Sequence, residues 1–143
     1  MRRLLPGILL FALATSLAGC NDNNTTPTTP TTPTTPTTPT VTETFSGTLN
    51  MNGGVTYPFT ATAAGTVTLT LSTLSGDATL PVGLSLGTWT GTACQIVIAN
   101  DAAAQTAVVT GTVTSAASLC ARVYDPAGKV TTPVDFTVTI AHP

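Results

Sequence analysis

The chain has very little charge and a single histidine. Only 10 of its 143 residues are Lys, Arg, Asp or Glu. That is 7% of the chain, whereas about 25% is usual in a soluble domain. Such a chain has no basic surface for nucleic acid, and one histidine excludes chemistry that needs two imidazoles. Threonine takes the place of the missing charge, with 34 copies.

Residues 1–19 have the features of a secretory signal peptide. A positive start at Arg2 and Arg3 is followed by an apolar stretch at residues 4–13, which is too short for a mature transmembrane helix. Because such a segment is removed on export, residues 1–19 are left out of the expected fold.

The four residues Leu17-Ala18-Gly19-Cys20 resemble the lipobox of bacterial lipoproteins. The resemblance implies cleavage before Cys20, a thioether lipid on its sulfur and acylation, for example with palmitate, of its new amino group. It also implies an anchor in the bacterial cell envelope, because several acyl chains hold a protein far more firmly than one. Asn21 rather than Asp follows the cysteine, which favours the outer membrane. Ordinary secretion with an incidental cysteine is the alternative.

Residues 20–40 are expected to form a spacer behind the lipid. Five Thr-Thr-Pro triplets fill residues 25–39. Proline fixes its own φ and biases the preceding residue toward extended geometry, and a period of three matches one turn of polyproline II. A segment of about twenty such residues reaches roughly 60 Å. We therefore expect a semi-rigid spacer that holds the next domain away from the membrane.

Residues 41–143 are expected to form one all-β domain. Apolar and polar residues alternate with a period of two, and Gly, Asn and Asp turns separate the runs. The predicted strands are 44–49, 55–61, 66–71, 80–86, 93–98, 106–112, 118–124 and 136–140. About eight short antiparallel strands at this spacing indicate a β-sandwich.

A series of short motifs in this domain resembles the bacterial pre-peptidase C-terminal domain. In chain order they are F-x-G at Phe45, Y-P-F at Tyr57, A-G-T-V-T-L-T-L at 64–71, R-V-Y-D at 122–125 and F-T-V-T-I at 136–140. The resemblance implies a small, jelly-roll-like sandwich that serves as a non-catalytic accessory module on secreted and surface proteins. An immunoglobulin-like sandwich is the alternative fold.

The three cysteines divide into one lipid site and one pair. If Cys20 carries the lipid, Cys94 and Cys120 remain together in an oxidising compartment. We expect a disulfide between them, and two buried free thiols are the alternative.

The expected strand faces conflict with that disulfide. Cys94 shares a face with apolar Ile96 and Ile98, whereas Cys120 lies on the face opposite the apolar residues of its own strand. A bulge, or Val97 turned toward the core on the first of the two strands, would place both cysteines on one face.

Aromatic residues are the candidate ligand-binding groups. Trp89 lies between glycines in the segment 87–91, and Tyr57 and Tyr124 are the other candidates. An exposed set of such rings would bind a carbohydrate or a peptide. Packing in the core or in a hairpin is the alternative role.

Neither catalysis nor metal binding is expected. His142 is next to the last residue, where chains fray, so we expect it to be solvated and without a serine partner. Asp101 and Asp125 are the least implausible calcium ligands, but both fall at turns and no D-x-D-x-D cluster accompanies them. We therefore expect no metal, no cofactor and no enzyme.

Alternating threonines at three places would form a flat hydroxyl array if their strands were adjacent. They are Thr66/Thr68/Thr70, Thr88/Thr90/Thr92 and Thr110/Thr112/Thr114. Such arrays occur in ice-binding sheets, and the alternative is that threonine simply replaces charge on exposed faces.

Together these features predict a non-catalytic, lipid-anchored cell-envelope protein that displays a β-sandwich on a spacer. Its expected partners are the membrane, through Cys20, and an envelope glycan or protein. A carbohydrate- or peptide-binding module that uses Trp89, Tyr57 and Tyr124 is the alternative function.

Overall fold

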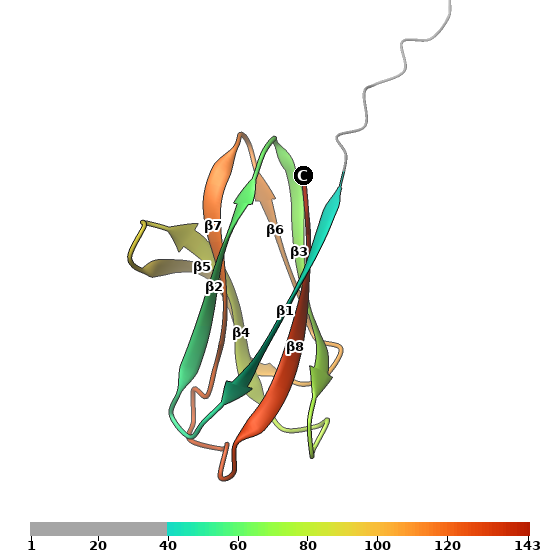
Figure 1. Cartoon of the computed structure of the whole chain (residues 1–143), viewed down its shortest axis with the longest axis vertical. Coiled ribbons are helices and arrows are strands. Elements are labelled where there is room, and N and C mark those ends of the chain that lie inside the picture. The colour runs from blue at the N-terminus through green and yellow to red at the C-terminus, as the bar shows by residue number, and fades with distance from the viewer. Residues whose placement is uncertain (1–39) are drawn as a thin grey trace, which may run out of the picture. The chain divides into compact units, whose positions relative to one another are not determined.

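The computed structural model describes residues 40–143, which form two four-stranded antiparallel sheets packed face to face (Figure 1). The strands are β1 (Val41–Leu49), β2 (Gly54–Ala61), β3 (Gly65–Leu74), β4 (Val82–Trp89), β5 (Cys94–Ala103), β6 (Val108–Val113), β7 (Ala117–Tyr124) and β8 (Val134–His142). The predictions for the signal peptide at residues 1–19, for Cys20 and for residues 21–39 of the spacer concern residues outside the described part. No helix in the described part is long and apolar enough to cross a membrane.

The strand order confirms the predicted jelly-roll-like sandwich. One sheet has the order β1-β8-β3-β6 and the other β2-β7-β4-β5. Eight strands shared equally between two sheets match a jelly roll, whereas an immunoglobulin constant domain has seven strands divided four to three.

Alternation of residue type along the strands builds the core. On β3, Val67, Leu69 and Leu71 are fully buried, and the threonines between them point outward. The same alternation on β8 buries Phe136 and Ile140. β-branched residues favour such a pleated, half-buried surface.

All eight predicted strands are present, most of them longer than predicted. The run Asp101-Ala-Ala-Ala-Gln105 is rich in alanine, which favours a helix, but β5 continues into it as far as Ala103. The sheet supplies hydrogen bonds that the isolated run lacks, and these outweigh its helix propensity.

Different segments of the chain lie at the two ends of the sandwich. Val41 pairs with His142, so the chain enters the domain at the end where it also finishes. The β1–β2 turn and Asp125 lie at the opposite end, where the Asp125 N–H donates to the Gly53 carbonyl at 2.9 Å.

Candidate functional site

A disulfide joins Cys94 and Cys120, as predicted, with their Cα atoms 5.7 Å apart. Leu86 of β4 pairs with Ile98, but the next residue of β4 pairs with Ile96, so Val97 is an extra residue in β5.

This bulge resolves the conflict between strand faces, because one inserted residue reverses the alternation. Ile98 faces the inner side of the sheet, as its cross-strand partner Leu86 does, whereas Cys94 faces the outer side. Val97 itself does not turn toward the core, since its side chain is 69% exposed.

Of the three candidate aromatic residues, Tyr57 lies at the inner edge between the sheets. Its ring stacks on Phe45, with the ring centroids 4.8 Å apart, and its hydroxyl donates to the Ser46 carbonyl at 2.6 Å. Burial raises the pKa of Tyr57. Tyr57 therefore links β2 to β1 and closes this edge of the sandwich.

Tyr124 lies on the outer face of the β2-β7-β4-β5 sheet. Its ring covers Gly83, where an added Cβ would overlap the ring, and its hydroxyl donates to the carboxylate of Asp101. Burial first, and then this hydrogen bond and the charge of Asp101, raise the pKa of Tyr124 to about 12. The guanidinium carbon of Arg122 lies 5.4 Å from the ring centroid.

Trp89 is the last residue of β4, pairs with Cys94 and is partly exposed. Figure 1 shows the β4–β5 hairpin standing out from one side of the sandwich. Trp89 is six residues along β4 from Gly83, roughly 20 Å from the ring of Tyr124. Within residues 40–143 no aromatic pair includes Trp89, so the structure does not gather the three candidates into one surface.

The two candidate calcium ligands bind protein groups instead. The carboxylate of Asp125 is buried and accepts the backbone N–H groups of Asn52, Lys129 and Val130 at 3.0, 2.9 and 3.2 Å. Burial alone would raise the pKa of Asp125, but these hydrogen bonds outweigh it and lower the pKa. Asp125 thus connects the β1–β2 turn to the β7–β8 loop. In the described part of the chain, no three His, Cys, Asp or Glu side chains gather around a point that suits a metal.

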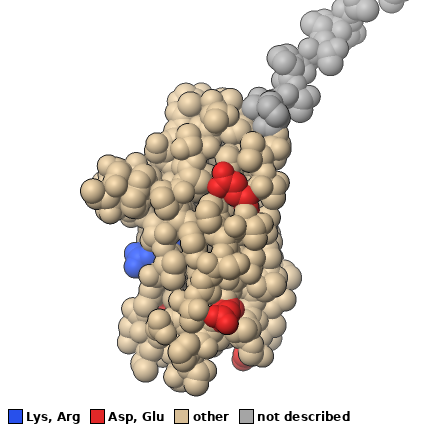
Figure 2. Space-filling view, in the orientation of Figure 1, with Lys and Arg blue, Asp and Glu red and all other residues tan. Residues whose placement is uncertain are grey.

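Hydroxyl groups cover the outer face of the β1-β8-β3-β6 sheet. Register pairs Thr66 with Thr112 and Thr68 with Thr110, so two of the three threonine runs lie side by side. Outward positions of β1 and β8 extend this surface, and its hydroxyl-bearing members include Thr42, Thr44, Ser46, Thr48, Thr66, Thr68, Thr70, Ser72, Thr73, Thr110, Thr112, Thr137 and Thr139. Figure 2 shows how few and how isolated the charged side chains are on the face in view.

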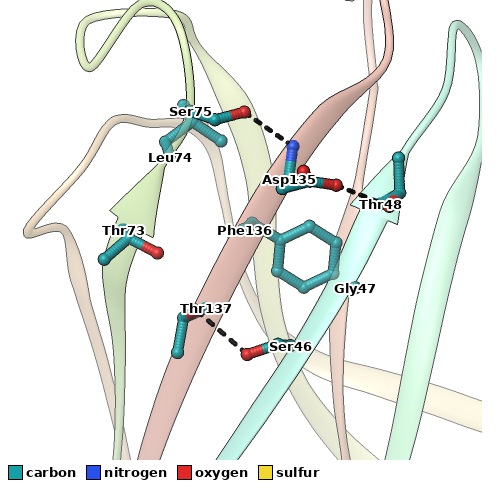
Figure 3. A pocket seen from close by; sticks show the side chains of 9 residues that line it. All are labelled: Ser46, Gly47, Thr48, Thr73, Leu74, Ser75, Asp135, Phe136 and Thr137. Atoms are coloured by element: carbon teal, nitrogen blue, oxygen red, sulfur yellow. Dashed lines mark hydrogen bonds between the residues drawn. The ribbon is translucent and has the colours of Figure 1, made fainter.

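A trough of about 440 Å³ lies on this face, across β1, β8 and β3. Its lining residues are Ser46, Gly47, Thr48, Thr73, Leu74, Ser75, Asp135, Phe136 and Thr137 (Figure 3). A bulge at Ser72, between the Leu71 and Thr73 pairings, redirects β3 beside the trough. Sequence reasoning missed this site, and its only signal was the alternation of threonine and serine on three separate strands.

A second, smaller hollow of about 120 Å³ lies between the edges of β5 and β6. Leu86, Ile98, Val113 and Leu119 contribute its apolar walls. Its size suits a single small side chain.

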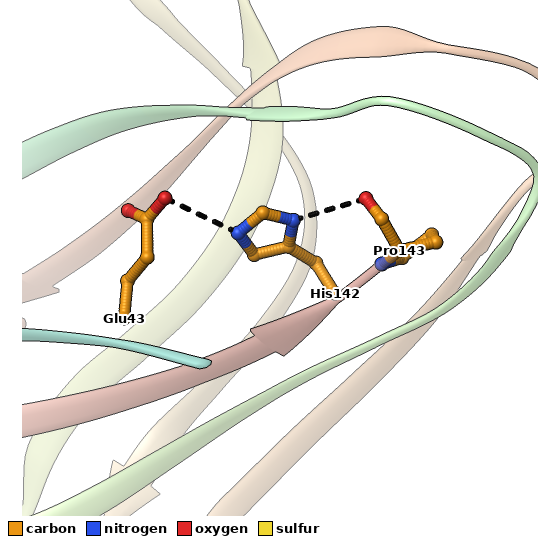
Figure 4. A network of polar contacts seen from close by, with 3 residues as sticks. All are labelled: Glu43, His142 and Pro143. Atoms are coloured by element: carbon orange, nitrogen blue, oxygen red, sulfur yellow. Dashed lines mark hydrogen bonds and ion pairs between the residues drawn. The ribbon is translucent and has the colours of Figure 1, made fainter. Parts of the chain in front are cut away.

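His142 is buried, so the expectation of a frayed, solvated histidine is wrong. Its side chain is 3% exposed, and Figure 4 shows its ring between Glu43 and Pro143. Nε2 lies 3.4 Å from the carboxylate of Glu43, and Nδ1 lies 3.2 Å from the Pro143 carbonyl. The end does not fray, because β8 pairs with β1 along its whole length and the Thr62 N–H donates to the Pro143 carbonyl at 2.9 Å.

Neither the protein-family models nor the curated proteins compared with this chain contain a match to it.

Proposed function

We propose that the chain is a non-catalytic, lipid-anchored protein of the bacterial cell envelope that displays its β-sandwich on a semi-rigid spacer. The observation that carries the proposal is the order of three features in the sequence. Four residues ending at Cys20 that resemble a lipobox precede the Thr-Thr-Pro triplets of residues 25–39, and a disulfide-closed domain follows. The disulfide supports the proposal because such bonds persist in oxidising compartments outside the cytoplasm.

The anchor is tested by mass spectrometry of the protein extracted from bacterial membranes. The expected product begins at Cys20 and carries the mass of a diacylglyceryl thioether and an amide-linked acyl chain. A Cys20→Ser variant should keep its signal peptide and lose these lipids. An unmodified Cys20 in the wild-type protein would overturn the anchor, and fractionation of the two membranes tests the expected outer-membrane location.

The displayed domain has a structural or recognition role in this proposal. The resemblance of its motifs to the pre-peptidase C-terminal domain favours an accessory module over an enzyme. The pairing of Val41 with His142 puts the start of the domain at one end of the sandwich, which favours display because the opposite end then lies away from the attachment point.

A carbohydrate- or peptide-binding role for the aromatic residues is the second candidate. Trp89 favours it, since this partly exposed ring lies on a hairpin that a disulfide holds in place. Trp89 is the single tryptophan of the chain, so its fluorescence reports on this hairpin alone. A ligand of this surface should change that fluorescence and should bind no Trp89→Ala variant.

A further inference from the structure

We propose that the trough across β1, β8 and β3 is a binding site for a neutral glycan. This inference rests on the recognition role proposed above and names the class of ligand for it. The trough is the larger of the two hollows described, and its volume of about 440 Å³ falls in the range of small-ligand sites, about 300–1,000 Å³.

The polar groups of the trough offer both donors and acceptors (Figure 3). The hydroxyls of Ser46 and Thr137 lie 3.0 Å apart and share one hydrogen, so one O–H between them is left to donate outward. The Ser75 hydroxyl accepts the backbone N–H of Asp135 at 2.8 Å, so its own hydrogen is also free.

Asp135 adds an acceptor between these donors. Thr48 donates to its Oδ1 at 2.6 Å, and no donor in residues 40–143 is bonded to its Oδ2. Each hydroxyl of a sugar both donates and accepts, so neighbouring sugar hydroxyls match this alternation of free O–H groups and a free carboxylate oxygen.

The charge of the lining disfavours anionic ligands. Asp135 is the one charged residue of the nine, and none of them is Lys or Arg, so an anionic ligand would be repelled. The two large apolar residues of the lining, Leu74 and Phe136, have their side chains buried in the core. The lining nevertheless exposes apolar atoms as well as polar ones, so it can contact the C–H faces of a sugar ring as well as its hydroxyls.

The backbone holds these groups in place before any ligand binds. Thr137 pairs with Ser46 on one side and with Thr73 on the other, and Asp135 pairs with Thr48. Groups fixed on three paired strands lose little conformational entropy on binding, which favours an uncharged ligand such as a neutral sugar, whose individual polar contacts are weak.

The trough also lies far from the point where the chain enters the domain. Thr48 is seven residues along β1 from Val41, a distance of roughly 23 Å. A site at this end of the sandwich would be presented away from the attachment point.

The experiment measures binding by the full lipidated chain in detergent micelles. The probes are soluble neutral oligomers of glucose, galactose, mannose and N-acetylglucosamine, with oligogalacturonate as an acidic comparison. We expect binding of at least one neutral oligomer. Asp135→Asn and Thr137→Val should weaken this binding about tenfold, the effect of losing one good polar contact. Thr73→Val serves as a third variant if either of these has a lowered unfolding temperature.

Two variants control for the other surfaces. Thr112→Val removes a hydroxyl from the same sheet face outside the trough, and Trp89→Ala removes the exposed ring. Both should change the affinity less than twofold. If Thr112→Val weakened sugar binding as much as the trough variants do, recognition would belong to the whole threonine face and not to the trough. The same would follow if the protein bound no sugar but changed the shape of growing ice crystals. Loss of binding only in Trp89→Ala, stronger binding of oligogalacturonate, or no binding of any neutral oligomer would also overturn the trough.

The lipid mass measured on the same preparation separates this inference from the proposed function. A lipidated Cys20 without sugar binding overturns the trough and leaves the anchor standing. An unmodified Cys20 with trough-dependent binding overturns the anchor and leaves the trough standing.

Discussion

The Cα atoms of Cys94 and Cys120 lie 5.7 Å apart although strand β4 runs between the strands that carry them. Two strands that flank a common neighbour are ordinarily about 9.5 Å apart. The short distance depends on Gly87, which pairs with both neighbours, and an added Cβ there would overlap the Gln95 carbonyl. The backbone of β5 therefore folds over the outer face of β4, and Cys120 is buried beneath it.

Gly87→Ala should prevent this disulfide from forming. The new methyl group would collide with backbone rather than with the flexible end of a side chain, so β5 has to move outward. Peptide mass mapping without reductant should then find Cys94 and Cys120 unlinked. Thr88→Ala, at the neighbouring exposed position of β4, should keep the link. A fully linked Gly87→Ala protein would contradict this account of the close approach.

Removing the disulfide should destabilise the domain by roughly 3–4 kcal/mol, because the bond closes a long loop in the unfolded chain. The two cysteines are 26 residues apart. Urea unfolding of the variant with both Cys94→Ala and Cys120→Ala measures the loss. Reductant should destabilise the wild-type protein by a similar amount and leave the double variant unchanged. A loss below about 1 kcal/mol would mean that removing the disulfide gives the unfolded chain little additional conformational freedom.

The strands could be predicted from the sequence, but the face of Cys94 could not. Threonine alternates with Val, Leu or Ile on β3 and β8, and this pattern alone indicates both strand and inward face. The bulge at Val97 leaves no such pattern, because Ile96, Val97 and Ile98 are all apolar. The side that each one faces is decided by pairing with β4 and by the disulfide.

The trough could not be predicted, because its residues meet only through long-range pairing. Ser46 and Thr137 are 91 residues apart, and nothing local to either one indicates that β1 and β8 are neighbours. The burial of His142 has the same cause. A position near the end of the chain predicts fraying, and only the pairing of β8 with β1 reverses that expectation.

Asp125→Asn should destabilise the domain by about 2 kcal/mol, since it removes the charge from hydrogen bonds to two loops. The folded state lowers the pKa of Asp125, so this carboxylate stabilises the fold above its ordinary pKa of about 3.9. That contribution is lost as the pH falls from there through the folded value. Urea unfolding between pH 6 and pH 2 should therefore show that the variant loses less of its free energy of unfolding on acidification than the wild-type protein does.

Asp77→Asn is the matched control for the acid effect. Hydrogen bonds from the hydroxyl and the backbone N–H of Thr79 also lower the pKa of Asp77, but this carboxylate is exposed and its hydrogen bonds in residues 40–143 stay within one turn. Its variant should retain nearly all of the wild-type stability. Equal losses in the two variants would show that connection of the loops by Asp125 adds nothing.

Gly83→Ala should lower the pKa of Tyr124 from about 12 toward its ordinary value of about 10. The added methyl group would occupy the space of the ring, so the ring has to lift away from β4 and release Asp101. The chain has two tyrosines, and absorbance titration in a Tyr57→Phe background follows Tyr124 alone.

In that background the midpoint should be about 12 with Gly83 and closer to 10 with alanine. Because the folded pKa is raised, the half-buried phenol stabilises the fold below pH 10, and this contribution is lost as the pH rises from about 10 to 12. The alanine variant should therefore show a flatter loss of stability over that interval. A midpoint that stays near 12 in Gly83→Ala would mean that the position of the ring over β4 does not cause the raised pKa of Tyr124.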